Sequence, residues 1–238
     1  MWNNVFFLTI ILHILCFSTR SETYDNDTER KLLCKIFISA TNVMKKYEEN
    51  KILKETIYGT RGRALFNERG TVELPWSCGL SGTGRGSLYD YYHGGGCFAD
   101  SLVGTFMCLC THGGNSDSKN FCRLGNVGGV EIWSGWETKE STKDLFEKVW
   151  KKVRESCFKE SRSSPGGEDD LRNLREVMKN VREQLRQGNE YFYLGGKEER
   201  SGCSGVNGDD VCVRCTGVSK DNAIIPWMKK IDGALEKL

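Results

Sequence analysis

The stretch ERKLLCKIFISATNV (residues 29–43) carries the clearest fold signal in the chain. Around it, apolar side chains recur at steps of three and four residues, the spacing of one face of an α-helix. This stripe consists of Leu33, Ile36, Phe37, Ala40, Met44 and Tyr47. We therefore expect a long amphipathic helix over residues 27–54, capped by Asn26 or Asp27 and ended by the glycines from Gly59 onward.

Two more segments show the same periodicity. Residues 138–160 carry a stripe of Leu145, Phe146, Val149, Trp150, Val153 and Cys157. Residues 171–187 carry Leu171, Leu174, Met178, Val181 and Leu185, a spacing typical of a coiled-coil seam or a buried bundle helix, and Gly188 follows. These patterns predict a mainly α fold, an elongated helical hairpin or bundle.

Glycine is dense and periodicity is poor between and after these helices. We interpret residues 78–122 and 203–215 as loop layers in which disulfides substitute for regular hydrogen-bond ladders. Within the first layer, residues 99–110 predict a short strand or helix that anchors it. A last apolar cluster lies at residues 224–231.

An apolar run over residues 5–17 precedes small polar residues and is too short to span a bilayer comfortably. It predicts a signal peptide over residues 1–21 and one mature domain over residues 22–238. Cys16 leaves with the signal, and an even set of cysteines remains, which in an exported chain predicts disulfides without giving their pairing. The disulfide candidates are Cys34, Cys78, Cys97, Cys108, Cys110, Cys122, Cys157, Cys203, Cys212 and Cys215.

Catalytic and metal chemistry find little support in the sequence. The mature chain has two histidines, His93 and His112, and a cysteine–histidine nucleophile would need an unpaired thiol. Zinc binding is the stronger alternative to disulfides, because Cys97, Cys108, Cys110 and His112 are close together in the sequence. Cys212 and Cys215 also have the spacing of a zinc knuckle. The oxidising export route favours disulfides instead, so we expect no enzyme, no cofactor and no metal.

Charge and modification signals are few. The formal net charge of +2 gives no indication of nucleic-acid binding. One glycosylation acceptor pattern, Asn26-Asp27-Thr28, lies near the expected new amino terminus. We expect Asn26 to be exposed there and to be a candidate for an N-linked glycan.

Several segments, in their order along the chain, carry a family resemblance. The expected helix that begins with ERKLLCKIFISATNV (29–43) ends in KETIYGT (54–60). YYHGGGCFADSLVGTFMCLCTHGG (91–114) and GWETKESTKDLFEKVWKKVRESC (135–157) follow. YFYLGG (191–196), GCSG (202–205) and IIPWMKKI (224–231) complete the series. Together they resemble the amino-terminal domain of an African trypanosome variant surface glycoprotein of the B-type-like class, over nearly the whole mature chain.

The resemblance implies a non-enzymatic coat glycoprotein at the cell membrane. Such proteins form homodimers that shield the parasite, and they evade host antibodies by antigenic variation. The family's lipid (GPI) anchor follows a further carboxy-terminal domain. Residues 233–238 bring no apolar tail, so we expect this chain, expressed as given, to be released into the medium rather than anchored.

Another function is compatible with the same scaffold. The chain could be a secreted soluble protein or a receptor for a host ligand, with Tyr89, Tyr91, Tyr92, Trp133 and Trp136 lining a pocket. Aromatic clusters are more often core packing than binding sites, which favours the coat protein.

Overall fold

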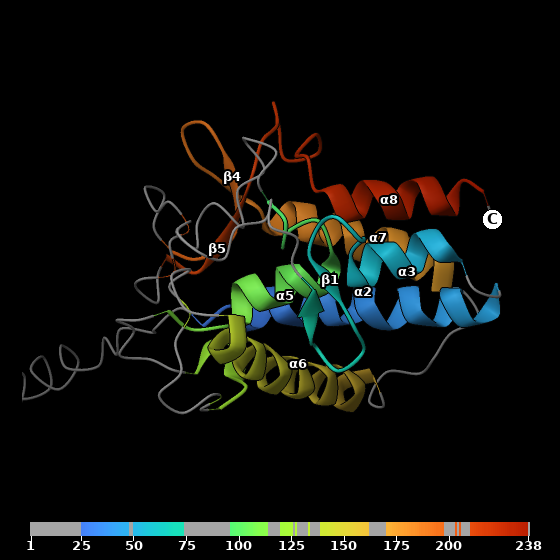
Figure 1. The fold of residues 1–238 in the computed structure, drawn as a ribbon. Coiled ribbons are helices and arrows are strands. Elements are labelled where there is room, and N and C mark those ends of the chain that lie inside the picture. The colour runs from blue at the N-terminus through green and yellow to red at the C-terminus, as the bar shows by residue number, and fades with distance from the viewer. Residues whose placement is uncertain are drawn as a thin grey trace, which may run out of the picture.

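The computed structural model describes residues 25–47, 50–73, 96–113, 120–125, 127, 133, 139–161, 170–197, 203, 205 and 210–237. Helices dominate this part of the chain (Figure 1). They are α2 (Asp27–Lys46), α3 (Lys51–Tyr58), α5 (Leu102–Cys110), α6 (Lys139–Ser161), α7 (Asp170–Gln184) and α8 (Pro226–Leu235), with a 3-10 turn η2 (Phe121–Arg123). The mainly α class predicted from the sequence is confirmed.

Helix α2 is the centre of an elongated bundle. It packs against α3, α5, α6 and α7, and α3 packs against α8. In Figure 1, α7 and α8 lie on one side of α2 and α6 lies on the other. The bundle predicted from the apolar stripes is therefore confirmed.

The strands are short. β1 (Leu65–Phe66) pairs antiparallel with β2 (Val72–Glu73), and β3 (Arg186–Gln187), β4 (Phe192–Gly195) and β5 (Cys212–Cys215) form an antiparallel sheet with β4 in the middle. Figure 1 places β4 and β5 at the end of the bundle that is farther from the carboxy terminus. Thus β5 is a sheet strand, where the sequence pattern predicted only loop.

The helix expected over residues 27–54 is two helices. α2 ends at Lys46, and α3 begins after Asn50, whose side-chain oxygen accepts hydrogen bonds from the amides of Ile52 (3.1 Å) and Leu53 (3.2 Å). A capping asparagine satisfies amides that a continuous helix would pair internally, so it starts a new helix. Tyr47, the last member of the expected stripe, is 37% exposed.

The ends of two other helices also differ from expectation. α7 stops at Gln184 because Arg186 and Gln187 pair with β4. The apolar cluster at residues 224–231 belongs largely to a helix, α8, which Pro226 begins in the first-turn position that proline favours.

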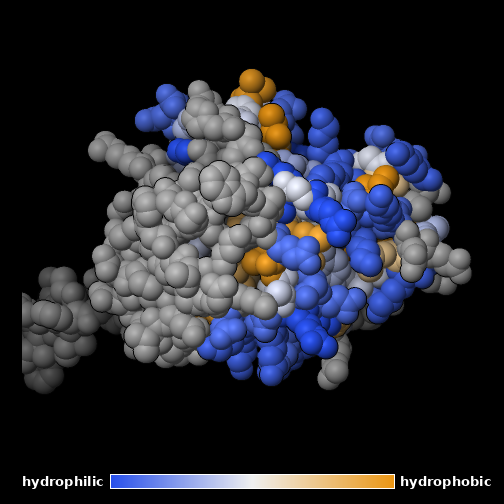
Figure 2. Space-filling view, in the orientation of Figure 1, coloured by the Kyte–Doolittle hydropathy of each residue, from blue (hydrophilic) through white to orange (hydrophobic). Residues whose placement is uncertain are grey.

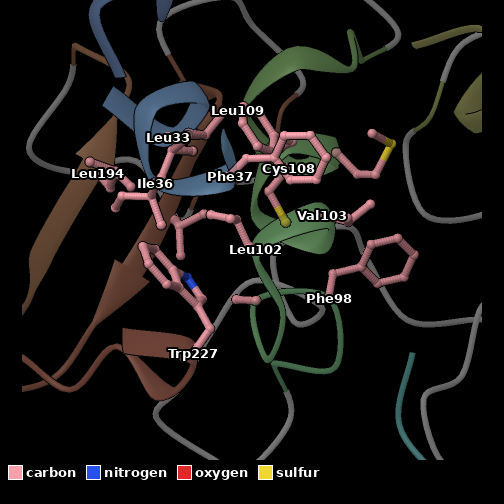
Figure 3. Close-up of a cluster of buried hydrophobic side chains, with 14 of the residues drawn as sticks. Leu33, Ile36, Phe37, Phe98, Leu102, Val103, Cys108, Leu109, Leu194 and Trp227 are labelled. Atoms are coloured by element: carbon pink, nitrogen blue, oxygen red, sulfur yellow. The ribbon is translucent and has the colours of Figure 1, made fainter. Parts of the chain in front are cut away.

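The core forms where the stripes meet (Figure 3). Leu33, Ile36 and Phe37 of α2 lie beside side chains of α5, Leu194 of β4 and Trp227 of α8. On α6, Leu145, Phe146, Val149, Trp150, Val153 and Cys157 are all buried, as the stripe predicted.

Helix α5 lies inside the core, since all of its residues are buried. Its start is fixed by Ser101, whose hydroxyl accepts a hydrogen bond from the Gly104 amide at 3.0 Å. Gly104 permits close packing: a Cβ there would lie 1.8 Å from the carbonyl oxygen of Phe98. The anchor expected over residues 99–110 is thus a helix in the core.

Disulfides of both long and short sequence separation cross-link the described part of the chain. Cys34–Cys157 ties α2 to α6, Cys110–Cys122 ties α5 to η2, and Cys203–Cys212 closes the segment before β5. Cys97 is also disulfide-bonded, and Cys78 lies outside the described residues.

The expectation that all ten cysteines are paired is wrong for Cys215, which is a buried thiol in the structure. Burial raises the pKa of the Cys215 thiol to about 12, which keeps it protonated at neutral pH.

A buried ion-pair network reinforces the link between α2 and α6. Arg30 is 3% exposed, and one of its Nη atoms donates to Asp27 and to Glu160, each at 2.7 Å. The other donates to the Ser156 hydroxyl at 2.8 Å. Burial alone would raise the pKa of Asp27, but hydrogen bonds from Lys31 and Arg30 outweigh it and hold that pKa below its usual value.

Cys215 should resist alkylation in the folded protein because its thiol is buried and almost entirely protonated. In denaturant without reductant, iodoacetamide should label Cys215 and leave Cys34 and Cys157 unlabelled. Peptide mass spectrometry checks all three. An unlabelled Cys215 in the denatured, unreduced chain would show that it is disulfide-bonded and would contradict the structure.

Arg30→Met should destabilise the fold by about 3 kcal/mol or more at pH 7, because it leaves the carboxylate of Asp27 buried without its guanidinium partner. Lys31→Met is the matched control: Lys31 also bonds Asp27 at 2.7 Å but is 51% exposed, so its loss should cost at most about 1 kcal/mol.

The cost of Arg30→Met should depend on pH. A lowered pKa in the folded state means that ionised Asp27 contributes stability above about pH 4, its unfolded pKa. That contribution is lost as the pH falls through the lowered value. Urea unfolding should therefore show a smaller difference between wild type and Arg30→Met at pH 3 than at pH 7. An equal difference at both would rule out this role for Asp27.

Candidate functional site

Disulfides use most of the cysteines that were considered as zinc ligands. Cys97 and Cys110 are disulfide-bonded, and so is Cys212 of the expected knuckle. His112 is buried, and its Nε2 lies 3.1 Å from the carbonyl oxygen of Val127. Among the described residues, no group of three or more metal-ligating side chains is arranged to hold an ion. His93 lies outside the described residues.

Of the five aromatic residues considered for a ligand pocket, the structure describes Trp133 alone. Trp133 is completely buried, with its ring 4.9 Å from that of Phe98 and 4.6 Å from that of Phe146 between centroids. It is therefore a core residue and not a pocket lining. Tyr89, Tyr91, Tyr92 and Trp136 lie outside the described residues.

A groove of about 740 Å³ runs between α6 and the turn that joins β1 to β2. Trp150 and Arg154 hold the turn in place by donating to the Glu68 carbonyl oxygen, at 3.1 and 2.6 Å. The remaining lining residues are mostly charged, with basic ones in excess: Arg69, Glu147, Lys148, Lys151, Glu155, Phe158 and Lys159. Such a lining is suited to recognising charge, and sequence periodicity gave no signal for it because the turn and the helix are distant in sequence.

The remaining described surface is mainly hydrophilic on the face seen in Figure 2, where apolar residues form small separate patches. Large exposed apolar side chains in the described residues are Tyr47, Phe158, Val218 and Ile224, and the last two belong to the same segment between β5 and α8. No helix in the described part of the chain combines the length and apolarity needed to cross a membrane.

Asn26, the glycosylation candidate, was expected to be exposed, but its exposed fraction is only 1%. It lies at a junction of three segments. Its Nδ2 donates to the carbonyl oxygens of Leu109 (2.9 Å) and Val211 (2.8 Å). Its Oδ1 accepts from the Gly196 amide at 3.0 Å. The backbone is left-handed, with φ of 56°, a conformation that asparagine adopts more readily than most residues.

This junction escaped sequence reasoning because nothing local indicates it. The partners of Asn26 are 83, 170 and 185 residues away. A polar residue before a helix predicts a cap, but no side-chain capping bond from Asn26 to α2 is present. Its side chain instead joins α2 to α5 and to the ends of β4 and β5.

Comparison with known proteins identifies the family. A family model described as the trypanosomal VSG domain matches residues 39–238, from within α2 through α8. A search among curated proteins found no match. The family model covers most of the sequence. The chain belongs to the trypanosomal VSG domain family.

Proposed function

We propose that this protein is a non-enzymatic coat protein of a trypanosome, which shields the cell surface and evades host antibodies by antigenic variation. The observation that carries the proposal is the family match over residues 39–238. The cross-linked helical bundle supports it, because shielding requires a stable scaffold and no chemical reaction.

The scaffold suits a protein whose exposed loops vary. Most residues of the stripes of α2, α6 and α7 are buried in a common core, and Cys34–Cys157 joins two of these helices. A disulfide in a small exported domain contributes roughly 2–5 kcal/mol. Stability held in this way does not depend on the sequence of exposed loops, where substitutions typically change it by about 0.5 kcal/mol or less.

The proposal includes export, dimerisation and attachment. Residues 1–21 would direct export, and the mature domain would pair as a homodimer. Attachment to the membrane would use the lipid anchor that the family resemblance implies. Host antibodies would be the main external partners.

A receptor for a host ligand is the second candidate, and the charged groove along α6 is the observation that favours it. Immobilised protein exposed to host serum separates the two functions. A saturable ligand that is lost with Lys151→Glu, and kept with Lys152→Glu, a change at a lysine that is also exposed but lies outside the groove lining, supports the receptor.

We expect the chain, joined to the lipid-anchored carboxy-terminal domain of an unrelated coat protein, to cover living trypanosomes at coat density. Antibodies against an invariant surface protein should then bind these cells as poorly as cells that carry the unrelated coat protein intact. Flow cytometry measures both surface density and antibody access. Free antibody access at full surface density would contradict the shielding function.

A further inference from the structure

Asn26 meets the sequence requirement for an N-linked glycan, but in the fold its side chain makes hydrogen bonds to three backbone groups. Thr28 completes the acceptor pattern and is exposed, whereas Asn26 is buried. Both hydrogens of its Nδ2 are engaged, one by Leu109 and one by Val211.

The chemistry of glycosylation is incompatible with these bonds. Transfer from a lipid-pyrophosphate oligosaccharide forms a bond between Nδ2 and the first sugar carbon and breaks the bond from that carbon to phosphate. The lipid pyrophosphate leaves, and Nδ2 gives up one proton. A glycosylated Nδ2 keeps one hydrogen, so the Leu109 or the Val211 carbonyl would lose its donor in a buried setting.

The junction also has no room for a sugar. Gly195 lies against it with φ of 79°, and even a Cβ at Gly195 would be 2.6 Å from Cδ2 of Leu109 and 2.8 Å from Oδ1 of Asn26. A sugar ring is far larger than a methyl group, so it would force the end of β4 away from α2.

We propose that a glycan on Asn26 and the native fold exclude one another, so that the folded protein is unmodified there and a chain glycosylated at Asn26 is diverted from the native state. The inference takes from the proposed function that the chain enters the secretory route. It adds that the acceptor pattern is a hazard during folding.

Because the chain is made from its amino terminus, glycosylation of Asn26 competes with folding. Val211 follows Asn26 by 185 residues, which takes roughly 10–40 s at the usual rate of synthesis. Until then the set of partners is incomplete, because Leu109, Gly196 and Val211 follow Asn26 by 83, 170 and 185 residues, and the glycosylating enzyme can reach its side chain. Folding protects the side chain only after β5 has been made.

Three forms of the chain test the proposal, each carrying a well-characterised secretory signal in place of residues 1–21 and expressed in a eukaryotic host. They are the wild type, Thr28→Ala and Gly195→Val. Thr28→Ala removes the acceptor pattern at an exposed position and leaves the junction intact. Gly195→Val keeps the pattern and disrupts the junction through steric overlap and a left-handed backbone.

Folded and unfolded pools are separated by trypsin resistance. The peptide that contains Asn26 is then analysed by mass spectrometry before and after peptide N-glycosidase, with Thr28→Ala as the unmodified standard. We expect no glycan on Asn26 in the folded wild type, and a glycan on most of the unfolded Gly195→Val chains. Thr28→Ala should fold in at least the wild-type yield.

Two results would overturn the proposal. A glycan on Asn26 in the trypsin-resistant wild type would show that the fold accommodates it. Unmodified Asn26 in both the folded wild type and the unfolded Gly195→Val chain would show that Asn26 is not glycosylated in either state. The native fold would then not be what prevents glycosylation. Because the secretory signal is supplied, neither result depends on residues 1–21 or on coat function.

Discussion

The fold depends on one amide side chain. Asn26 precedes the central helix α2, and its three hydrogen bonds fix that helix to the end of α5 and to the residues flanking β4 and β5. Each partner is a backbone group, so the bonds set the positions of chain segments and not only of side chains. A buried backbone carbonyl without a donor costs about 1–3 kcal/mol, which makes the junction expensive to break.

The stronger cross-links gather near the same end of α2. Arg30 lies one turn beyond Asn26 and bonds Glu160 of α6, and Cys34 lies one turn farther and is joined to Cys157. Cys110, next to Leu109, is joined to Cys122 of η2. Elsewhere α2 is held by apolar packing against α3 and α7. Polar and covalent links thus secure the end of the bundle that bears the sheet, and this arrangement suits a coat protein whose scaffold must tolerate sequence change around it.

Sequence reasoning succeeded where the determining interactions are local. The stripes of α2, α6 and α7 were predictable because a helix with one buried face repeats its apolar residues every three or four positions. α5 was ambiguous because it is buried on all sides and so has no polar face. β5 is four residues long and pairs with residues about twenty positions earlier, which leaves no local signal. The burial of Asn26 could not be predicted, because its local pattern indicates an exposed acceptor and its partners are distant in sequence.

The most direct test compares Asn26→Asp with Thr28→Ala by urea unfolding with the disulfides intact. Both changes remove the acceptor pattern, but only Asn26→Asp removes the two donors and places an oxygen against the carbonyls of Leu109 and Val211. Asn26→Asp should lower the free energy of unfolding by about 3 kcal/mol or more. Thr28→Ala should change it by about 0.5 kcal/mol or less. Equal unfolding free energies for the two variants would contradict the central role of Asn26.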